Sequence, residues 1–80
     1  MANKRLERLR QRPKDFTWDE LVALLKGLGY TMKTGGGGSG RKFIDADKRK
    51  ISLHKPHPEN TLKAYVIDDV LTALEEHGKI

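Results

Sequence analysis

The stretch FTWDELVALLKGLG, residues 16–29, carries the signals for both ends of one helix and for its buried face. Thr17 and Glu20 have the spacing of a capping box, in which each of the two side chains accepts a hydrogen bond from a backbone N–H at the start of a helix. The leucines that follow recur at helical spacing, at positions Leu21, Leu24, Leu25 and Leu28. Gly29 can supply the left-handed residue that commonly ends a helix. The stretch therefore predicts a helix that starts after Thr17 and packs one apolar face on a core.

Three short strand candidates and a second helix follow this stretch. The strand candidates are residues 30–34, 41–45 and 51–54, and two prolines stop the last of them. The second helix is expected over residues 65–77, with an apolar face made of Ile67, Val70, Leu71 and Leu74. Short links favour an antiparallel meander, and both helices need to cover the same sheet face. The sequence therefore predicts an α+β fold, an α-β-β-β-α two-layer sandwich with a three-stranded antiparallel sheet.

The residues before this domain form a basic segment. Residues 1–15 are expected to be an N-terminal arm with a short helix around Leu6 and Leu9, and residues 16–80 to be the domain itself. Eighty residues with 36% hydrophobic side chains make at most one domain with a thin core. The absence of cysteine excludes a disulfide scaffold and fits a reducing cytoplasm. We expect neither a signal peptide nor a membrane span.

The charge of the chain is unevenly distributed. The formal net charge is +5, with cations concentrated in residues 1–15 and 41–55 and acids in residues 66–77. Segregated positive charge favours a polyanionic partner, and above all a nucleic acid, over uniform surface decoration. Trp18 and Tyr65 lie outside the basic clusters, so we expect them in the core or at its rim rather than as stacking platforms for bases.

A run of glycines opens onto cations at the start of the second strand candidate. Residues 35–40 lie between two strands that need each other, so they are interpreted as a native loop rather than as an engineered linker. Ser39, Arg41 and Lys42 offer one hydroxyl and two cations that suit a phosphate, and Lys55 follows the last strand. The alternative is a strand end that is merely solvated.

His54 and His57 are the candidate proton-transfer groups, because histidine takes up and releases protons near neutral pH. His54 alternates with Leu53 and should point away from the core, on the same sheet face as only one of the adjacent Arg41 and Lys42. The alternative is that both histidines order a proline-rich turn. A zinc site is disfavoured, because residues three apart on a strand point to opposite faces and no third ligand is evident.

Over about residues 16–80 the chain resembles the HicA-type toxins, the small mRNA interferases of two-gene toxin–antitoxin pairs. The resemblance is carried by the capped helix and its Leu28-Gly29-Tyr30 end, by Gly38-Ser39 ahead of Phe43, by the His-Lys-Pro-His-Pro strand end and by the closing helix. It implies a fold similar to a double-stranded-RNA-binding domain and cleavage of mRNA without a metal or cofactor. It also implies a HicB-type antitoxin that covers the active face.

The resemblance further implies where the chemistry takes place. Members of the family commonly carry Gly-Ser-His at the start of the second strand, with that histidine as the catalytic residue, and the matching position here is Gly40. Another group would have to replace it, the candidates being His54, His57 and Arg41. Three functions stay open: an endoribonuclease toxin, a non-enzymatic RNA-binding module, and a protein whose basic surface binds only an acidic antitoxin.

Overall fold

The computed structural model describes residues 4–34, 40–56 and 58–80. The elements, in chain order, are α1 (Lys4–Arg10), α2 (Trp18–Gly27), β1 (Thr31–Thr34), β2 (Gly40–Ile44), β3 (Lys50–His54) and α3 (Ala64–Glu76). The expected α-β-β-β-α order is confirmed, and each predicted strand differs from the observed one by a residue at most at either end. The short helix expected near Leu6 and Leu9 is also present, as α1.

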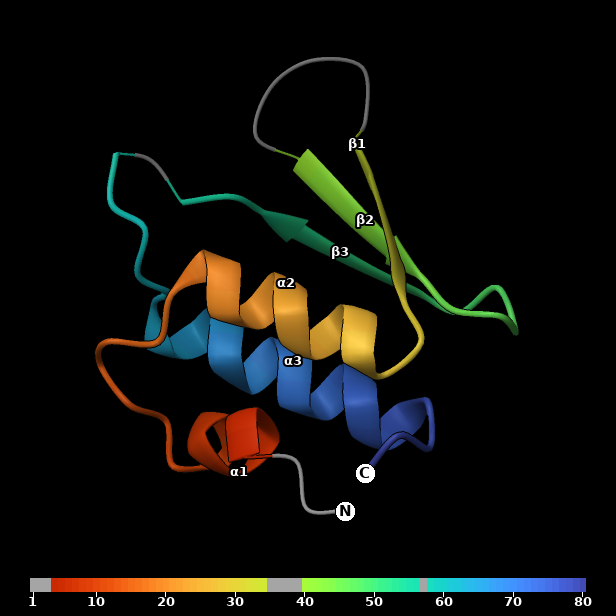
Figure 1. Ribbon diagram of the computed structural model, residues 1–80, viewed down its shortest axis with the longest axis horizontal. Coiled ribbons are helices and arrows are strands. Elements are labelled where there is room, and N and C mark those ends of the chain that lie inside the picture. Colours follow the sequence, from red (N-terminus) through yellow and green to blue (C-terminus); the bar gives the residue numbers. More distant parts are fainter. Residues whose placement is uncertain (1–3, 35–39, 57) are drawn as a thin grey trace.

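The three strands form an antiparallel meander in the order β1-β2-β3, which confirms the predicted α+β fold. Helix α2 contacts β1 and helix α3 contacts β3, so both helices cover one face of the sheet (Figure 1). In the part of the chain that the structure describes, no helix combines the length and the apolar character needed to cross a membrane.

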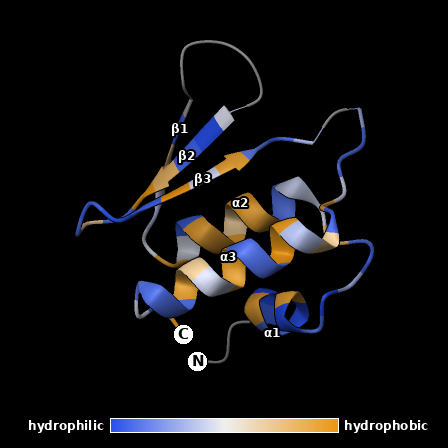
Figure 2. Ribbon diagram, turned by 180° about the vertical axis from the view of Figure 1, so that it is seen from behind, coloured by the Kyte–Doolittle hydropathy of each residue, from blue (hydrophilic) through white to orange (hydrophobic). Residues whose placement is uncertain are grey.

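The core lies between this face and the two helices. From the sheet, Phe43, Ile51 and Leu53 point inward and are at most 7% exposed. The Trp18 ring of α2 meets Phe43 with 5.9 Å between ring centroids. Each helix alternates hydrophobic and hydrophilic segments, as expected for an element with one buried side (Figure 2). The predicted apolar residues of the second helix, Ile67, Val70, Leu71 and Leu74, are all buried.

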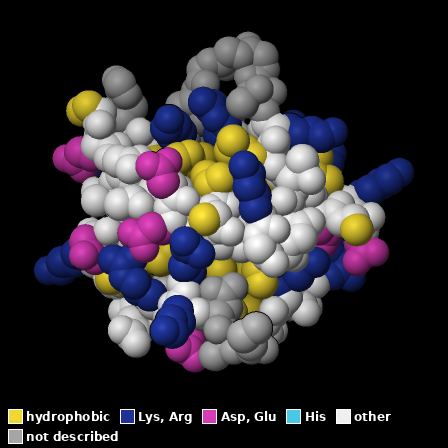
Figure 3. Space-filling view, in the orientation of Figure 1, with side chains coloured by type: hydrophobic (Ala, Val, Ile, Leu, Met, Phe, Trp, Pro, Cys, Tyr) yellow, Lys and Arg dark blue, Asp and Glu magenta, His cyan; other side chains and the backbone are white. Residues whose placement is uncertain are grey.

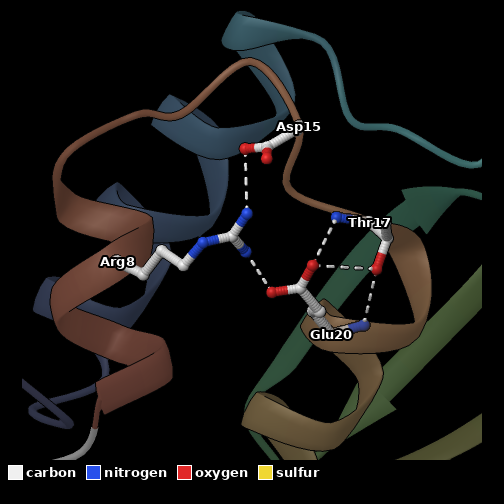
Figure 4. Close-up of polar contacts among 4 residues, drawn as sticks. All are labelled: Arg8, Asp15, Thr17 and Glu20. Carbon is white, nitrogen blue, oxygen red and sulfur yellow. Dashed lines mark hydrogen bonds and ion pairs between the residues drawn. The ribbon is translucent and has the colours of Figure 1, made fainter.

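The start of α2 has the capping box that the sequence predicts. Thr17 Oγ1 accepts a hydrogen bond from the Glu20 N–H at 3.2 Å, and Glu20 Oε1 accepts one from the Thr17 N–H at 3.4 Å. Arg8 of α1 pairs with Glu20 and also with Asp15 at 2.8 Å (Figure 4). Gly29 follows the helix with a φ of +97°, the left-handed conformation expected there.

Helix α1 packs on the domain. It lies on the side of α2 and α3 away from the sheet (Figure 1), and the side chain of Leu9 is fully buried. Arg8 and Arg12 form ion pairs that join this segment to the two longer helices, since Arg12 pairs with Asp68 of α3. Part of the positive charge of residues 1–15 is therefore neutralised within the protein.

Thr17→Ala should destabilise the fold by about 1 kcal/mol, because the Glu20 N–H loses its side-chain acceptor. For a domain of this size we expect a melting temperature lower by roughly 4–8 °C in a thermal unfolding experiment. Thr72→Ala is the matched control, since Thr72 is exposed within α3 and should leave the melting temperature unchanged or raise it slightly. Equal melting temperatures for Thr17→Ala and the wild type would contradict the role given to the cap.

Candidate functional site

Two of the predicted site residues, Lys42 and His54, lie on the sheet face opposite the helices. Alternate strand residues point to this side, which we call the outer face: Thr31, Lys33, Gly40, Lys42, Ile44, Lys50, Ser52 and His54. Lys42 pairs with Ser52 across β2 and β3, and Gly40 pairs with His54. Within the described ranges no helix covers this face, so its side chains are open to a partner.

The outer face is positively charged. Lys33 of β1 lies directly opposite Lys42 of β2, and both side chains are exposed. The sequences of the three strands contain no Asp or Glu. Lysine and arginine side chains, without acidic ones, also appear at the upper edge of Figure 3, where β1 ends and β2 begins. Like charges placed opposite each other destabilise a sheet, and a bound anion would relieve that repulsion.

Residues Lys33, Lys42 and Lys50 have no ion pair within the described chain. The ion pairs that the described residues form instead involve Arg8, Arg12 and Lys79, none of which lies on the outer face. The charges of these three lysines are therefore not neutralised by an ion pair among the described residues, and an external anion can pair with them.

His54 lies at the end of β3, exposed on the outer face, and its partner in the register is Gly40. Side chains directly opposite each other in an antiparallel pair have Cβ atoms about 4.5–5.5 Å apart and share a face. A Cβ built on Gly40 would meet no atom within 4 Å. Gly40, the position that matches the family's usual histidine, thus carries no side chain. His54 is the residue directly opposite it on the neighbouring strand.

The structure separates the other predicted site residues. Lys42 shares the face of His54, whereas Arg41 lies on the other face with Phe43, and its Nη1 donates to the Gly40 carbonyl oxygen at 2.9 Å. Lys55 follows His54 and is exposed. Ser39 and His57 lie outside the described residues, as do residues 35–38 of the glycine run.

A pocket lies next to His54, where the chain runs from β3 to α3. Its volume is about 340 Å³, and its lining comprises His54, Lys55, Pro56, Pro58, Glu59, Thr61, Leu62, Lys63, Tyr65 and Val66. Trp18 belongs to the core, as expected, with 3% of its surface exposed. Tyr65 does not lie in the core, because its side chain is 64% exposed; it lines the pocket together with two lysines.

A second polar cluster joins the β2–β3 turn to the C-terminal residues. Asp45 is 5% exposed; it accepts a hydrogen bond from the Arg49 N–H at 2.8 Å and pairs with Lys79 at 3.4 Å. Burial opposes its ionisation, but these partners outweigh it and hold the pKa of Asp45 below its usual value. Burial raises the pKa of Tyr30, whose hydroxyl lies 2.6 Å from His77 Nδ1. The cluster includes no outer-face residue. Its contacts connect the β2–β3 turn to the C-terminal residues and stabilise both.

Sequence reasoning missed several residues of the site: Lys33, Lys50, Ser52, Lys63 and Tyr65. The first three could have been found from strand alternation, once the inward direction of Phe43 and Ile51 was fixed. No cluster of three or more potential metal ligands occurs among the residues that the structure describes.

Comparison with known proteins identifies the family of the chain. No curated protein and no solved structure gives a significant match. A family model does match, over residues 18–78, which span α2, the whole sheet and α3. The model is described as the HicA toxin of bacterial toxin–antitoxin systems, and it covers well over half of the chain. The chain therefore belongs to the HicA toxin family.

Proposed function

We propose that this toxin binds mRNA on its outer face and cleaves it as an endoribonuclease in the cytoplasm, until a HicB-type antitoxin covers the same face. The observation that carries the proposal is the pairing of His54 with Gly40, beside Lys42 and Ser52 on the outer face. A proton-transfer group, two neighbouring lysines and a hydroxyl thus lie on one uncovered surface. These are the groups that recognition and cleavage of a phosphodiester require.

The proposed cleavage needs only RNA and protein side chains. His54 removes the proton from a ribose 2′-hydroxyl, whose oxygen then attacks the adjacent phosphorus. The new bond joins phosphorus to the 2′-oxygen, and the bond to the 5′-oxygen of the next nucleotide breaks. The products are a 2′,3′-cyclic phosphate and a free 5′-hydroxyl, after a proton reaches the leaving oxygen. Lys42 lies on the face of His54 and would stabilise the charge that develops on the phosphoryl oxygens.

The acid that protonates the leaving oxygen is assigned to His57 in this proposal. His57 comes three residues after His54 in the chain. His54 protonated in the first step could also return the proton, since the protonated base is an acid. The cleavage rates of the wild type and of His57→Gln distinguish the two routes. A slower rate for His57→Gln supports His57 as the acid, whereas equal rates support protonated His54.

The outer face is also the surface at which we expect an antitoxin to bind and neutralise the toxin. The lysines of the outer face would attract acidic side chains of a protein as well as RNA phosphates. An antitoxin bound there would cover His54 and block access of RNA. The proposal therefore expects RNA and antitoxin to compete for this toxin.

A second candidate function is binding without cleavage. It is favoured by one observation, the glycine at position 40, where the family commonly has its catalytic histidine. Expression of the wild-type chain without its antitoxin separates the candidates. We expect growth arrest with fragmented mRNA, whereas intact mRNA in cells that express the folded protein would leave only the binding function.

RNA binding should weaken steeply as salt rises. With about three lysine–phosphate contacts on single-stranded RNA, the Kd should increase roughly 20-fold between 50 and 200 mM salt. Lys42→Gln should lower the slope of log Kd against log salt by about 0.7, as expected for one lost contact. Lys26→Gln removes an exposed lysine of α2 instead and should leave the slope unchanged. A Kd that hardly responds to salt would contradict phosphate binding by this face.

A further inference from the structure

We infer that the pocket between the end of β3 and the start of α3 binds one nucleobase of a single-stranded RNA, with Tyr65 as the stacking partner. This rests on the proposed function, because it assigns a further contact of the same RNA. The pocket has a volume of about 340 Å³, near the lower end of the range for small-molecule sites. Its size suits one planar group rather than a large ligand.

Tyr65 is placed as a stacking surface. Its side chain is 64% exposed, and it is the large hydrophobic residue that stands out as exposed among those the structure describes. The buried stripe of α3 starts at Ile67, about 200° around the helix from Tyr65, so Tyr65 contributes little to the core. Nucleobases stack on exposed aromatic rings in proteins that bind single strands.

Two lysines share the pocket with the Tyr65 ring. Lys55 and Lys63 line the same pocket, and both are exposed. Lys63 is also the N-cap residue of α3, whose first turn has no acidic residue and no side-chain cap. The start of this helix therefore adds to the attraction that the two lysines exert on a phosphate. A nucleotide fits this arrangement, with its base on Tyr65 and its phosphate near the lysines.

Two further residues define how the nucleotide would lie. His54 belongs to both the pocket lining and the outer face, so a base in the pocket places its neighbouring phosphodiester beside the proposed general base. Glu59 is the acidic residue of the lining. It would repel a phosphate but can accept a hydrogen bond from the amino group of a base. The bases of a duplex are already stacked, so the pocket selects single strands.

The test uses the full chain and a short fluorescein-labelled oligoribonucleotide of mixed sequence. Its 2′-positions are O-methylated, so that it cannot be cleaved by attack of the 2′-hydroxyl. Tyr65→Ala should raise the Kd about 10-fold, as expected for the loss of one stacked base. Tyr65→Phe keeps the ring and should bind like the wild type. The control Thr72→Ala, at an exposed position of the same helix, should also bind like the wild type.

A second oligonucleotide, with the same backbone but without bases, isolates the stacking contribution. Wild type and Tyr65→Ala should bind it equally. Equal affinities of these two proteins for the oligonucleotide with bases would overturn the pocket assignment, while salt-dependent binding by both would leave the proposed function standing. Absence of binding by the wild type would overturn both. A Tyr65→Ala change that weakens only the capture of the co-expressed antitoxin would make the pocket a protein-docking site and overturn the inference.

Discussion

His54→Ala should lower the rate of RNA cleavage by about 10²- to 10⁴-fold, the usual contribution of a positioned general base. The reason is geometric, since His54 is the histidine that the structure describes on the outer face, beside Lys42 and Ser52. Its side chain is exposed, so its removal should leave the melting temperature close to that of the wild type. Cells that express the variant without antitoxin should grow and keep their mRNA intact.

His77→Ala is the matched histidine control. Its ring is bound to the Tyr30 hydroxyl at 2.6 Å, in the cluster that fastens the β2–β3 turn to the chain end. This change should lower the melting temperature but leave the cleavage rate of the folded protein unchanged. The two variants thus distinguish an effect on the cleavage rate, expected for His54→Ala, from an effect on stability, expected for His77→Ala. Full toxicity of a folded His54→Ala protein would show that another group acts as the base.

The sequence predicts the helices well because their signals are local. The capping box of Thr17 and Glu20 and the left-handed Gly29 each involve residues within one turn, and all three have the expected geometry. The sequence also indicates that Tyr65 is exposed, because Tyr65 falls outside the apolar stripe of α3 that begins at Ile67. Its place in one pocket with Lys55 depends on the fold, which brings the end of β3 next to the start of α3.

The site itself depends on contacts between distant parts of the chain. Alternation along β3 shows that His54 points outward, but the pairing of His54 with Gly40 depends on the register of two strands joined by a turn. The choice between Arg41 and Lys42 depends on the inward direction of Phe43. The pocket forms where the loop after β3 meets the start of α3, and neither segment indicates it alone.

Gly40→His should preserve the fold and restore cleavage to a protein that lacks His54. A Cβ at this position meets nothing within 4 Å, and Gly40 is not among the described glycines with positive φ, so a side chain fits without strain. The two positions are directly opposite, so their Cβ atoms would lie about 5 Å apart on one face. An imidazole at position 40 can therefore reach a phosphodiester held beside Lys42.

The informative protein is the double variant Gly40→His with His54→Ala, compared with Gly40→Asn with His54→Ala. Both replace the glycine with a polar side chain, but only histidine exchanges protons near neutral pH. If the outer face positions RNA as proposed, the first should recover at least about 10-fold of the cleavage rate lost in His54→Ala, and the second should recover none. Equal inactivity of the two folded proteins would mean that the scissile phosphate does not lie over this pair of strand positions. Recovery by histidine alone would show that an imidazole on either β2 or β3 can act on the same scissile phosphate, held over this pair of strand positions.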